Sequence, residues 1–283
     1  MELLRTLLFV PGNRQKMIDK AISLAADALV LDLEDSVAPA EKELARQTIR
    51  ESLSNRVPGG PDLYVRVNGT ATGLIEADLD AVVVPGLAGI MLPKAESAEQ
   101  VRHVDALIAR REAKVGLPEG SLKLIPIMET ARGIIQAVDI TGASERTVAI
   151  AFGAEDFTLD IGTTRSKEGS ELFHARSAMV LAAAAHGVQA LDTVFSDVAD
   201  DEGLLADATL GRRLGFSGKC LIHPKQIAPV TQVYSPSPEE ITYAQRIVEA
   251  FQASGSGVIS LDGKMIDPPV YQRAKRVLER AGS

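Results

Sequence analysis

The sequence predicts an α/β fold, a (β/α)8 TIM barrel followed by a C-terminal helical extension. Apolar runs of four to six residues alternate with amphipathic stretches from the N-terminal segment to about residue 222. Eight such strand–helix units in about 230 residues fit the size of this barrel. Five of the apolar runs also end in polar or charged residues. A parallel barrel brings such strand ends together at one face, where catalytic residues lie.

The expected elements follow one another in chain order. Strands are expected at residues 5–10, 28–32, 63–67, 88–92, 123–128, 147–152, 188–191 and 218–222. Helices are expected at residues 14–26, 40–54, 73–81, 97–113, 131–139, 171–186 and 200–214. Glu41 and Glu43 favour the positive N-terminal end of one helix, and Ser97 is a suitable N-cap for another. A doubly wound open sheet is the competing architecture, although the first strand–turn, FVPGNRQK, lacks the GxGxxG fingerprint.

The chain continues beyond the eighth expected strand. Residues 1–230 are expected to form the barrel domain, and residues 231–283 an extension that packs on a neighbouring subunit. Its expected elements are a helix, a hairpin and a last helix, at residues 236–253, 255–267 and 268–281. Asp262–Gly263 is a type I′ turn signal for the hairpin.

Composition limits the class of protein. The 283 residues carry a net charge of -8 and a pI of about 5.2, which argues against nucleic acid as the main partner because phosphate binding needs a basic surface. No run of 18 apolar residues predicts a membrane span, and the N-terminus reads as a first strand and not as a signal peptide. The single cysteine, Cys220, excludes an internal disulfide and predicts a buried, inert thiol. A cytoplasmic enzyme is the expected class.

The residues available for chemistry lie at the ends of five expected strands. They are Asp32, Glu34 and Asp35, then Arg66 and Asn68, Lys94 and Glu96, Glu129 and Arg132, and Glu155 and Asp156. Glu129 and Asp156 form the best metal-ligand pair, because carboxylate oxygens suit Mg²⁺, with Mn²⁺ as an alternative. The four histidines are scattered, which argues against Zn²⁺. The simpler interpretation is that both acids only cap the helices that follow them.

Arg66 and three acidic residues are expected at the ends of two neighbouring strands. Arg66 can grip a carboxylate with two parallel hydrogen bonds, or it can pair with a neighbouring strand-end acid. Asp32, Glu34 and Asp35 would repel one another unless a metal, an arginine or shared protons compensate. We expect them to hold Arg66 and the waters around a metal, although a solvated loop is the alternative.

Further residues near the expected mouth are candidates for substrate contact. Gly153 allows close backbone approach to a ligand, and with Ala154 and Glu155 it is expected to contribute to substrate binding. Gly12 lies at a similar turn. Arg14 and Lys16 follow the first strand and could pair with phosphates.

Other catalytic mechanisms have weaker support. His223 ends the last expected strand, where a structural hydrogen bond is at least as plausible as a role in catalysis. Lys94 suggests a Schiff base, but the nearby carboxylate pair favours a metal-dependent reaction. The sequence has no GxSxG elbow and no Cys/His pairing, so an acyl-enzyme is disfavoured.

Eight segments between about residues 3 and 275 form a recognisable set: LLFVPG, ALVLDLEDSVAP, YVRVNG, GIMLPKAE, IPIMETARGI, AFGAEDFTLDIG, GFSGKCLIHPKQI and DGKMID. Together they resemble the citrate lyase β-subunit family, which belongs with the malyl-CoA and citramalyl-CoA lyases in a superfamily of Mg-dependent aldolases. This resemblance implies a TIM barrel with a C-terminal helical extension, assembled as a homotrimer or a hexamer.

The resemblance also implies roles for individual residues. Glu129 and Asp156 would bind Mg²⁺, and Arg66 would grip the carboxylate of a keto-acid. The acids of the DLED motif, Asp32, Glu34 and Asp35, would support the site. Asp267 of the MID motif would reach into a neighbour's active site and handle a proton.

The implied reaction is the cleavage of a hydroxy-acyl thioester between C2 and C3, to a keto-acid and an acetyl thioester. Asp267 would protonate the enolate that leaves, and Arg14 and Lys16 would contact the phosphates of CoA or phosphopantetheine. Citryl, malyl and citramalyl thioesters all remain open. A citrate lyase α subunit and an acyl carrier protein are possible partners. The alternatives are a metal-dependent aldolase acting on free keto-acids without CoA, and a binding protein that retains the barrel.

Overall fold

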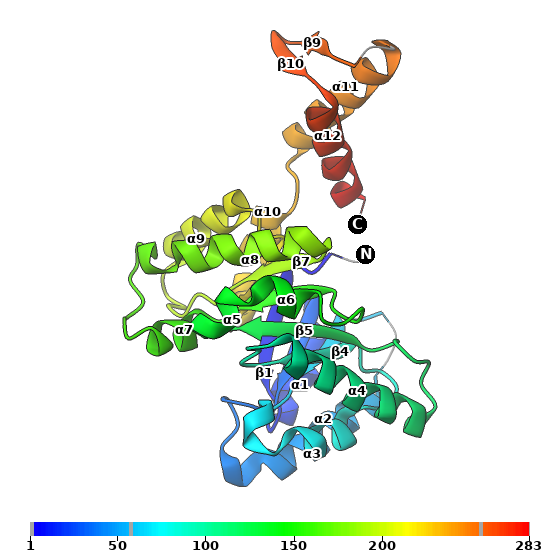
Figure 1. Ribbon diagram of the computed structural model, residues 1–283, viewed down its shortest axis with the longest axis vertical. Coiled ribbons are helices and arrows are strands. Elements are labelled where there is room, and N and C mark those ends of the chain that lie inside the picture. Colours follow the sequence, from blue (N-terminus) through cyan, green and yellow to red (C-terminus); the bar gives the residue numbers. More distant parts are fainter. Residues whose placement is uncertain (1–2, 57–58, 255–256, 283) are drawn as a thin grey trace.

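Eight parallel strands close into a barrel in the computed structural model of this chain (Figure 1). The structure describes residues 3–56, 59–254 and 257–282. Residues 255–256, where the expected hairpin segment begins, therefore lie outside the described residues. The barrel strands are β1 (Thr6–Pro11), β2 (Ala28–Asp32), β3 (Asp62–Arg66), β4 (Gly89–Leu92), β5 (Lys123–Met128), β6 (Ala149–Phe152), β7 (Gln189–Asp192) and β8 (Gly218–Leu221). Each strand pairs with the next, and β8 returns to β1. The predicted fold class is confirmed, and the open-sheet alternative is wrong.

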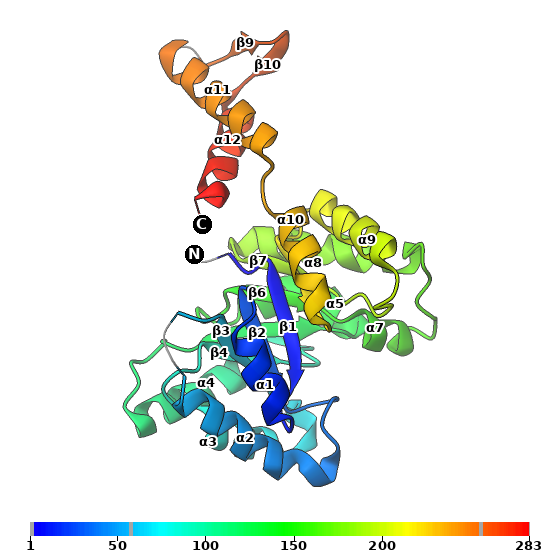
Figure 2. The same ribbon diagram turned by 180° about the vertical axis from the view of Figure 1, so that it is seen from behind.

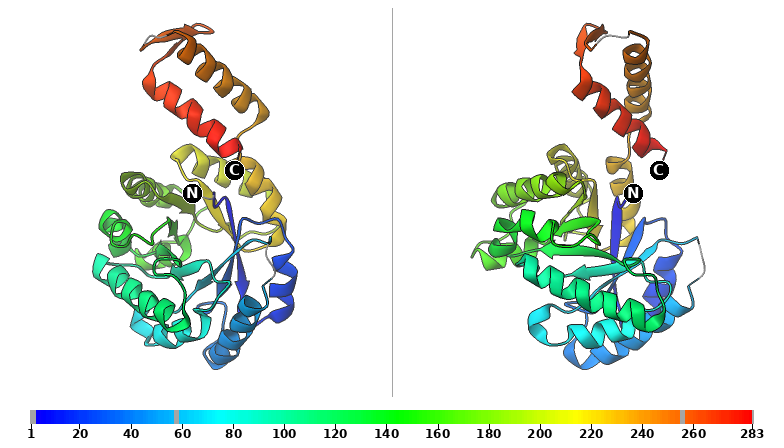
Figure 3. Two further views of the ribbon diagram at one scale, coloured as in Figure 1. Left: turned by 90° about the vertical axis from the view of Figure 1, so that its right-hand side faces the viewer. Right: turned by 45° about the vertical axis from the view of Figure 1, so that its right-hand side comes forward.

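Helices that follow the strands along the chain surround the barrel (Figure 3). They are α1 (Gln15–Ile22), α2 (Lys42–Ser54), α3 (Ile75–Val82), α4 (Ala98–Val115), α5 (Ala131–Ile135), α6 (Ala137–Thr141), α7 (Ala154–Asp160), α8 (Phe173–His186), α9 (Asp201–Leu214) and α10 (Ile227–Tyr234). The single helix expected over residues 131–139 is two short helices that meet at Gln136. Helices α7 and α10 were not predicted, because α7 is only seven residues long and α10 contains Pro229. Proline is tolerated there because the first turn of a helix does not use its N–H groups within the helix.

The alternation of side chains along each strand determines which of them point into the barrel. On β2, Ala28 and Val30 belong to the apolar cluster inside the barrel, whereas Leu29 and Leu31 pack toward the helices. Because successive strand side chains point to opposite faces, the next inward position on β2 is Asp32. The same alternation takes β3 from Tyr64 to Arg66. Strand packing therefore aims these two polar side chains into the barrel mouth.

The extension consists of α11 (Pro238–Ser254), a β9 (Ile259–Leu261) and β10 (Lys264–Ile266) hairpin, and α12 (Pro268–Ala281). Asp262 and Gly263 both have positive φ, 51° and 74°, as the predicted type I′ turn requires. A small apolar core, comprising Ala244, Ile247, Ile266 and Ala274, joins the elements.

The extension projects from the barrel on the side from which β1 starts, while the arrowhead of β1 points away from it (Figure 2). Helix α10 packs against β1, β8 and α9, and the expected domain boundary at residue 230 falls within it. An exposed ion pair, Arg212 to Glu240 at 2.8 Å, links α9 of the barrel to α11 of the extension. None of the described helices is both long and apolar enough to cross a membrane.

Candidate active site

Asp32 and Arg66 form the base of the candidate site. They are direct partners in the β2–β3 register, so their side chains leave the barrel wall side by side. Arg66 Nε and Nη2 donate to the two carboxylate oxygens of Asp32 at 2.7 and 2.8 Å. Burial alone would raise the pKa of Asp32, but Arg66 and the Ser36 hydroxyl, 2.5 Å away, hold the pKa below its usual range. Asp32 is therefore a fixed anion that orients the guanidinium.

A second carboxylate holds the other side of Arg66. Glu34 Oε2 lies 2.8 Å from Arg66 Nη1, and the guanidinium lies 5.0 Å from the centre of the Phe9 ring. Asp35 is exposed and stands 3.8 Å from Nη1. Burial opposes the charge on Arg66, but the Asp32 bond and the surrounding carboxylates outweigh it and raise its pKa. The predicted ion pairing of Arg66 with strand-end acids is thus present in the structure.

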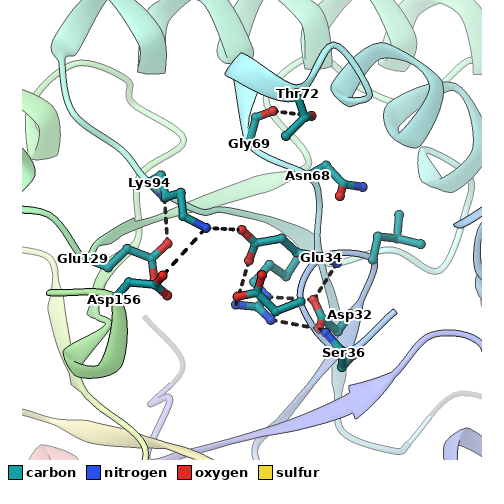
Figure 4. Close-up of polar contacts among 12 residues, drawn as sticks. Asp32, Glu34, Ser36, Asn68, Gly69, Thr72, Lys94, Glu129 and Asp156 are labelled. Carbon is teal, nitrogen blue, oxygen red and sulfur yellow. Dashed lines mark hydrogen bonds and ion pairs between the residues drawn. The ribbon is translucent and has the colours of Figure 1, made fainter. Parts of the chain in front are cut away.

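Lys94 connects this cluster to the opposite side of the mouth (Figure 4). Its Nζ donates to Glu34 Oε1 at 2.7 Å and lies 4.0 Å from Asp156 Oδ1. Burial alone would lower the pKa of Lys94, but Glu34 and the nearby carboxylates raise it to about 12. Burial raises the pKa of Glu34 despite Arg66 and Lys94. A lysine held as an ammonium ion is a poor Schiff-base nucleophile, which weighs against that alternative.

Glu129 directly follows β5 and is buried at the mouth. Its Oε1 accepts a hydrogen bond from the Lys94 backbone N–H at 2.9 Å. Gly153 makes room for it, because a Cβ at that position would lie only 2.4 Å from Glu129 Oε2. Burial, and then the charges of Glu34 and Asp156, raise the pKa of Glu129 to about 8. Apart from the Lys94 ammonium, which lies 4.0 Å from Asp156 Oδ1, little positive charge offsets the carboxylates on this side.

This raised pKa predicts how the stability of the metal-free protein depends on pH. The folded state holds the Glu129 proton up to about pH 8, whereas the unfolded chain releases it near 4.5. The stability that the protonated group contributes is thus complete below about pH 4.5 and lost as pH rises to about 8. Glu129→Gln, which imitates the protonated form, should unfold at a higher temperature than wild type in EDTA, by a margin that widens over this range. Circular dichroism melts at several pH values measure the margin, and a constant margin would contradict the assignment.

A cavity of about 470 Å³ opens beside these groups. Its lining includes most of the predicted site residues, namely Asp32, Asp35, Arg66, Glu129, Gly153, Ala154, Glu155 and Asp156. Thr193 also lines it and accepts a hydrogen bond from the Ala154 N–H at 3.0 Å. The structure thus brings an anchored guanidinium and the carboxylates of Glu129 and Asp156 to one chamber.

The residues at the mouth fit a hard divalent cation. Among the described residues, we find no group of three or more His, Cys, Asp or Glu side chains that could hold a metal ion. Mg²⁺ is commonly held by one or two carboxylates and keeps several waters, so Glu129 with Asp156 is a sufficient set. The position of Glu129 favours a cation, because burial, and then the charges of Glu34 and Asp156, disfavour its ionised form, and a bound metal would offset both.

Other predicted residues lie at the edge of the site or outside it. Arg14 and Lys16 are exposed at the start of α1, on the same side of the barrel as the mouth. Glu155 is half-exposed and pairs with Arg165 at 2.9 Å. Asp267 is on the extension, where it caps α12 by accepting a hydrogen bond from the Val270 N–H at 3.0 Å. Within one chain the structure therefore does not bring Asp267 to the mouth.

Some strand-end residues have structural roles. Asn68 is buried, and its side chain and backbone N–H both donate to Asp78. His223 accepts a hydrogen bond from the Lys225 N–H through Nδ1 and so caps a short turn.

Sequence reasoning missed two contacts of Arg66 and Asp32, those made by Phe9 and Ser36. Phe9 could have been found, because it occupies an inward position near the end of β1. Ser36 was a weaker signal, since serine commonly makes such local bonds in turns.

The model of the HpcH/HpaI aldolase/citrate lyase family matches residues 5–224 of this sequence. The chain belongs to this family. That result confirms the family resemblance that the motifs predicted, and it places the match over the whole barrel up to the turn after β8.

Relatives of the family match nearly the full chain. Citrate lyase subunit beta of Leuconostoc mesenteroides subsp. cremoris is 42% identical, covering 99% of this chain and 93% of that protein. The mitochondrial citramalyl-CoA lyase of Homo sapiens is 38% identical, covering 99% and 86%. The crystal structure of CitE from Mycobacterium tuberculosis, in complex with magnesium, acetoacetate and coenzyme A, has a TM-score of 0.82 and 36% identity, covering 99% of each chain.

Proposed function

We infer that this protein is a Mg²⁺-dependent carbon–carbon lyase that cleaves a hydroxy-acyl thioester of the citryl, malyl or citramalyl type. The products are an acetyl thioester and a 2-keto acid. The observation that carries the inference is one chamber that combines Arg66, fixed by Asp32, with the carboxylates of Glu129 and Asp156. The names of the relatives support it, since they include citrate lyase β subunits and citramalyl-CoA lyases, and a related structure contains magnesium and coenzyme A.

Arg66 is suited to bind the carboxylate that becomes part of the keto-acid. A guanidinium has five N–H groups, so Nη1 and Nη2 each keep an N–H for substrate even though Asp32 accepts from Nε and Nη2 and Glu34 pairs with Nη1. Asp32 and Glu34 hold the group in place before substrate arrives, so little orientation entropy remains to be lost on binding. Gly153, Ala154 and Glu155 would shape the opposite wall of the chamber.

The reaction breaks the bond between C2 and C3, and its electron pair passes to the carbon that becomes the acetyl group. A Mg²⁺ ion held by Glu129 and Asp156 would supply electrostatic stabilisation where charge changes during cleavage. As the bond breaks, the substrate hydroxyl loses its proton and becomes the keto group, and that proton would pass to water at the mouth. The resulting enolate takes up a proton, which Asp267 from a neighbouring subunit would deliver. Arg14 and Lys16 would bind phosphates of the thioester carrier, either CoA or phosphopantetheine.

This mechanism requires an oligomer, because Asp267 is the N-cap of α12 and the extension projects from the side of the barrel away from its own mouth (Figure 2). A homotrimer or hexamer would meet the requirement.

A citrate lyase α subunit and an acyl carrier protein are the possible partners if the substrate is citryl thioester. The cytoplasmic location stays a prediction.

A metal-dependent aldolase that acts on free keto-acids is the second candidate. The description of the matched family includes aldolases, which is the observation in its favour. Such an enzyme should tolerate loss of Asp267 and should ignore CoA.

Incubation of the protein with Mg²⁺ and separate malyl-, citramalyl- and citryl-CoA tests the proposal. We expect acetyl-CoA from one thioester, detected by mass spectrometry, and no product when EDTA is present. Cleavage that persists in EDTA would contradict the metal requirement. Absence of product from all three would contradict a free-standing CoA lyase, and binding of pyruvate, oxaloacetate or glyoxylate would then support the aldolase.

A further inference from the structure

Lys94 has an unusual backbone conformation at the edge of the metal site. Its φ is +51°, a left-handed value that side-chain-bearing residues rarely adopt. Two contacts hold the strained loop, since the Lys94 N–H donates to Glu129 Oε1 at 2.9 Å and its carbonyl accepts from Gln100 Nε2 at 3.1 Å. Strain of this kind persists where the surroundings enforce it, often at functional sites. The backbone of Lys94 is thus fixed independently of its side chain.

The ammonium group of Lys94 occupies a position among the site's carboxylates. Its Nζ stands 2.7 Å from Glu34 Oε1 and 4.0 Å from Asp156 Oδ1, and Figure 4 shows it between Glu34 on one side and Glu129 with Asp156 on the other. It therefore supplies positive charge to the same acids that a divalent cation would neutralise. Two cations near one carboxylate pair repel each other, so a metal and this ammonium compete.

A second cavity lies on the other side of Lys94. It measures about 480 Å³ and is lined by Glu34, Lys94, Glu96, Arg132 and the hydroxyl-bearing residues Thr70, Thr72 and Ser97. Glu96 uses its backbone N–H to bind Gln100, while we find no ion pair to its carboxylate among the described residues. The flexible Lys94 side chain, about 42% exposed, borders this space already. An acceptor and room for the ammonium are thus available away from the metal position.

We propose that Lys94 is a displaceable internal cation of the metal site. Without metal, its ammonium neutralises Glu34 and Asp156; when a divalent cation binds, it turns into the outer cavity, where Glu96 receives it. The inference rests on the metal assignment given under Proposed function. Metal binding is then an exchange of one cation for another. The interaction of the displaced ammonium with Glu96 would contribute to the measured affinity for Mg²⁺.

Isothermal titration of Mg²⁺ into wild type and Lys94→Met tests the competition. The neutral side chain cannot compete, so the variant should bind Mg²⁺ about tenfold more tightly or better. In EDTA the variant should melt at a lower temperature than wild type, because the acids lose their counter-charge. Saturating Mg²⁺ should raise its melting temperature more than that of wild type. A merely structural lysine would not give opposite changes in these two states.

Glu96→Gln tests the outer position of the lysine. In the wild-type background we expect it to weaken Mg²⁺ binding by about threefold or more, since the displaced ammonium loses its acceptor. In the Lys94→Met background the same change should have little effect, because interacting residues give non-additive results. Glu99→Gln, an exposed carboxylate in the first turn of α4, is the matched control and should change neither affinity.

The outcomes separate this inference from the proposed function. Wild type that binds Mg²⁺ while a folded Lys94→Met binds it equally or more weakly would overturn the inference alone. An equal effect of Glu96→Gln in both backgrounds would overturn the outer position. Wild type that fails to bind Mg²⁺ would overturn the metal assignment itself, and the inference with it.

Discussion

Glu129→Gln is expected to abolish Mg²⁺ binding and, with it, thioester cleavage, while the barrel stays folded. The carboxylate is buried and shares its surroundings with Glu34 and Asp156, so its negative charge is costly without a cation. An amide of the same shape can still accept the Lys94 N–H bond but is a much weaker ligand for a hard cation. We expect the affinity for Mg²⁺ to fall by at least about a hundredfold, because buried charges are strongly coupled to a bound ion. Asp156→Asn should have the same direction of effect.

Calorimetric titration measures the affinity, and circular dichroism shows whether the fold is intact. Glu119→Gln makes the same chemical change at an exposed position before β5, away from the mouth, and should bind Mg²⁺ as wild type does. Unchanged affinity in both Glu129→Gln and Asp156→Asn would refute the metal assignment.

Subunits that lack Arg66 and subunits that lack Asp267 should restore each other's activity when mixed. Asp267 is the N-cap of α12 in the extension and Arg66 ends β3 at the mouth, and the extension projects from the side of the barrel at which β1 starts, away from the mouth (Figure 2). Arg66→Ala removes the carboxylate grip, and Asp267→Asn removes the acid. Asparagine is also a good N-cap, so the second change should leave the start of α12 intact. Each variant alone should be nearly inactive.

The activity that mixing should restore follows from the probability that one site has both intact residues. In a random equal mixture, half of the barrels keep Arg66 and half of the neighbouring extensions keep Asp267. About a quarter of the sites therefore combine both, and activity should approach that fraction of wild type. Thioester assays on oligomers whose mixed composition is verified by native mass spectrometry give the result. An absence of recovery would count against action across an interface.

The barrel and the centre of its site follow from sequence for a physical reason. The alternation of side chains along a strand determines which of them face inward, and the C-terminal ends of parallel strands all lie at the same face of the barrel. Asp32, Arg66 and Glu129 were therefore predictable as neighbours before any geometry was known. The register between β2 and β3 adds the direct pairing of Asp32 with Arg66, which a pattern along one strand does not contain.

Residues on loops followed no such rule. Lys94 comes after β4, and its contacts with Glu34 and Glu129 depend on a left-handed backbone that the segment LPKAE does not reveal. Asp267 shows the other limit. Its sequence motif is clear, but a position on a projecting extension depends on packing between chains, which one sequence does not encode as a pattern.

The extension's separation from the barrel has a consequence for cooperativity. The extension has a small apolar core of its own, separate from the core of the barrel, and one contact that links it to the barrel is an exposed ion pair worth at most about 1 kcal/mol. A single chain therefore contains two separate cores, so one two-state transition is not expected for the monomer. If neighbouring subunits cover the extension, its melting temperature depends on protein concentration. The melting temperature of the barrel depends on concentration only if the barrel also takes part in the interface. Dilution would then loosen the element that carries Asp267 before it affects the site that Asp267 serves.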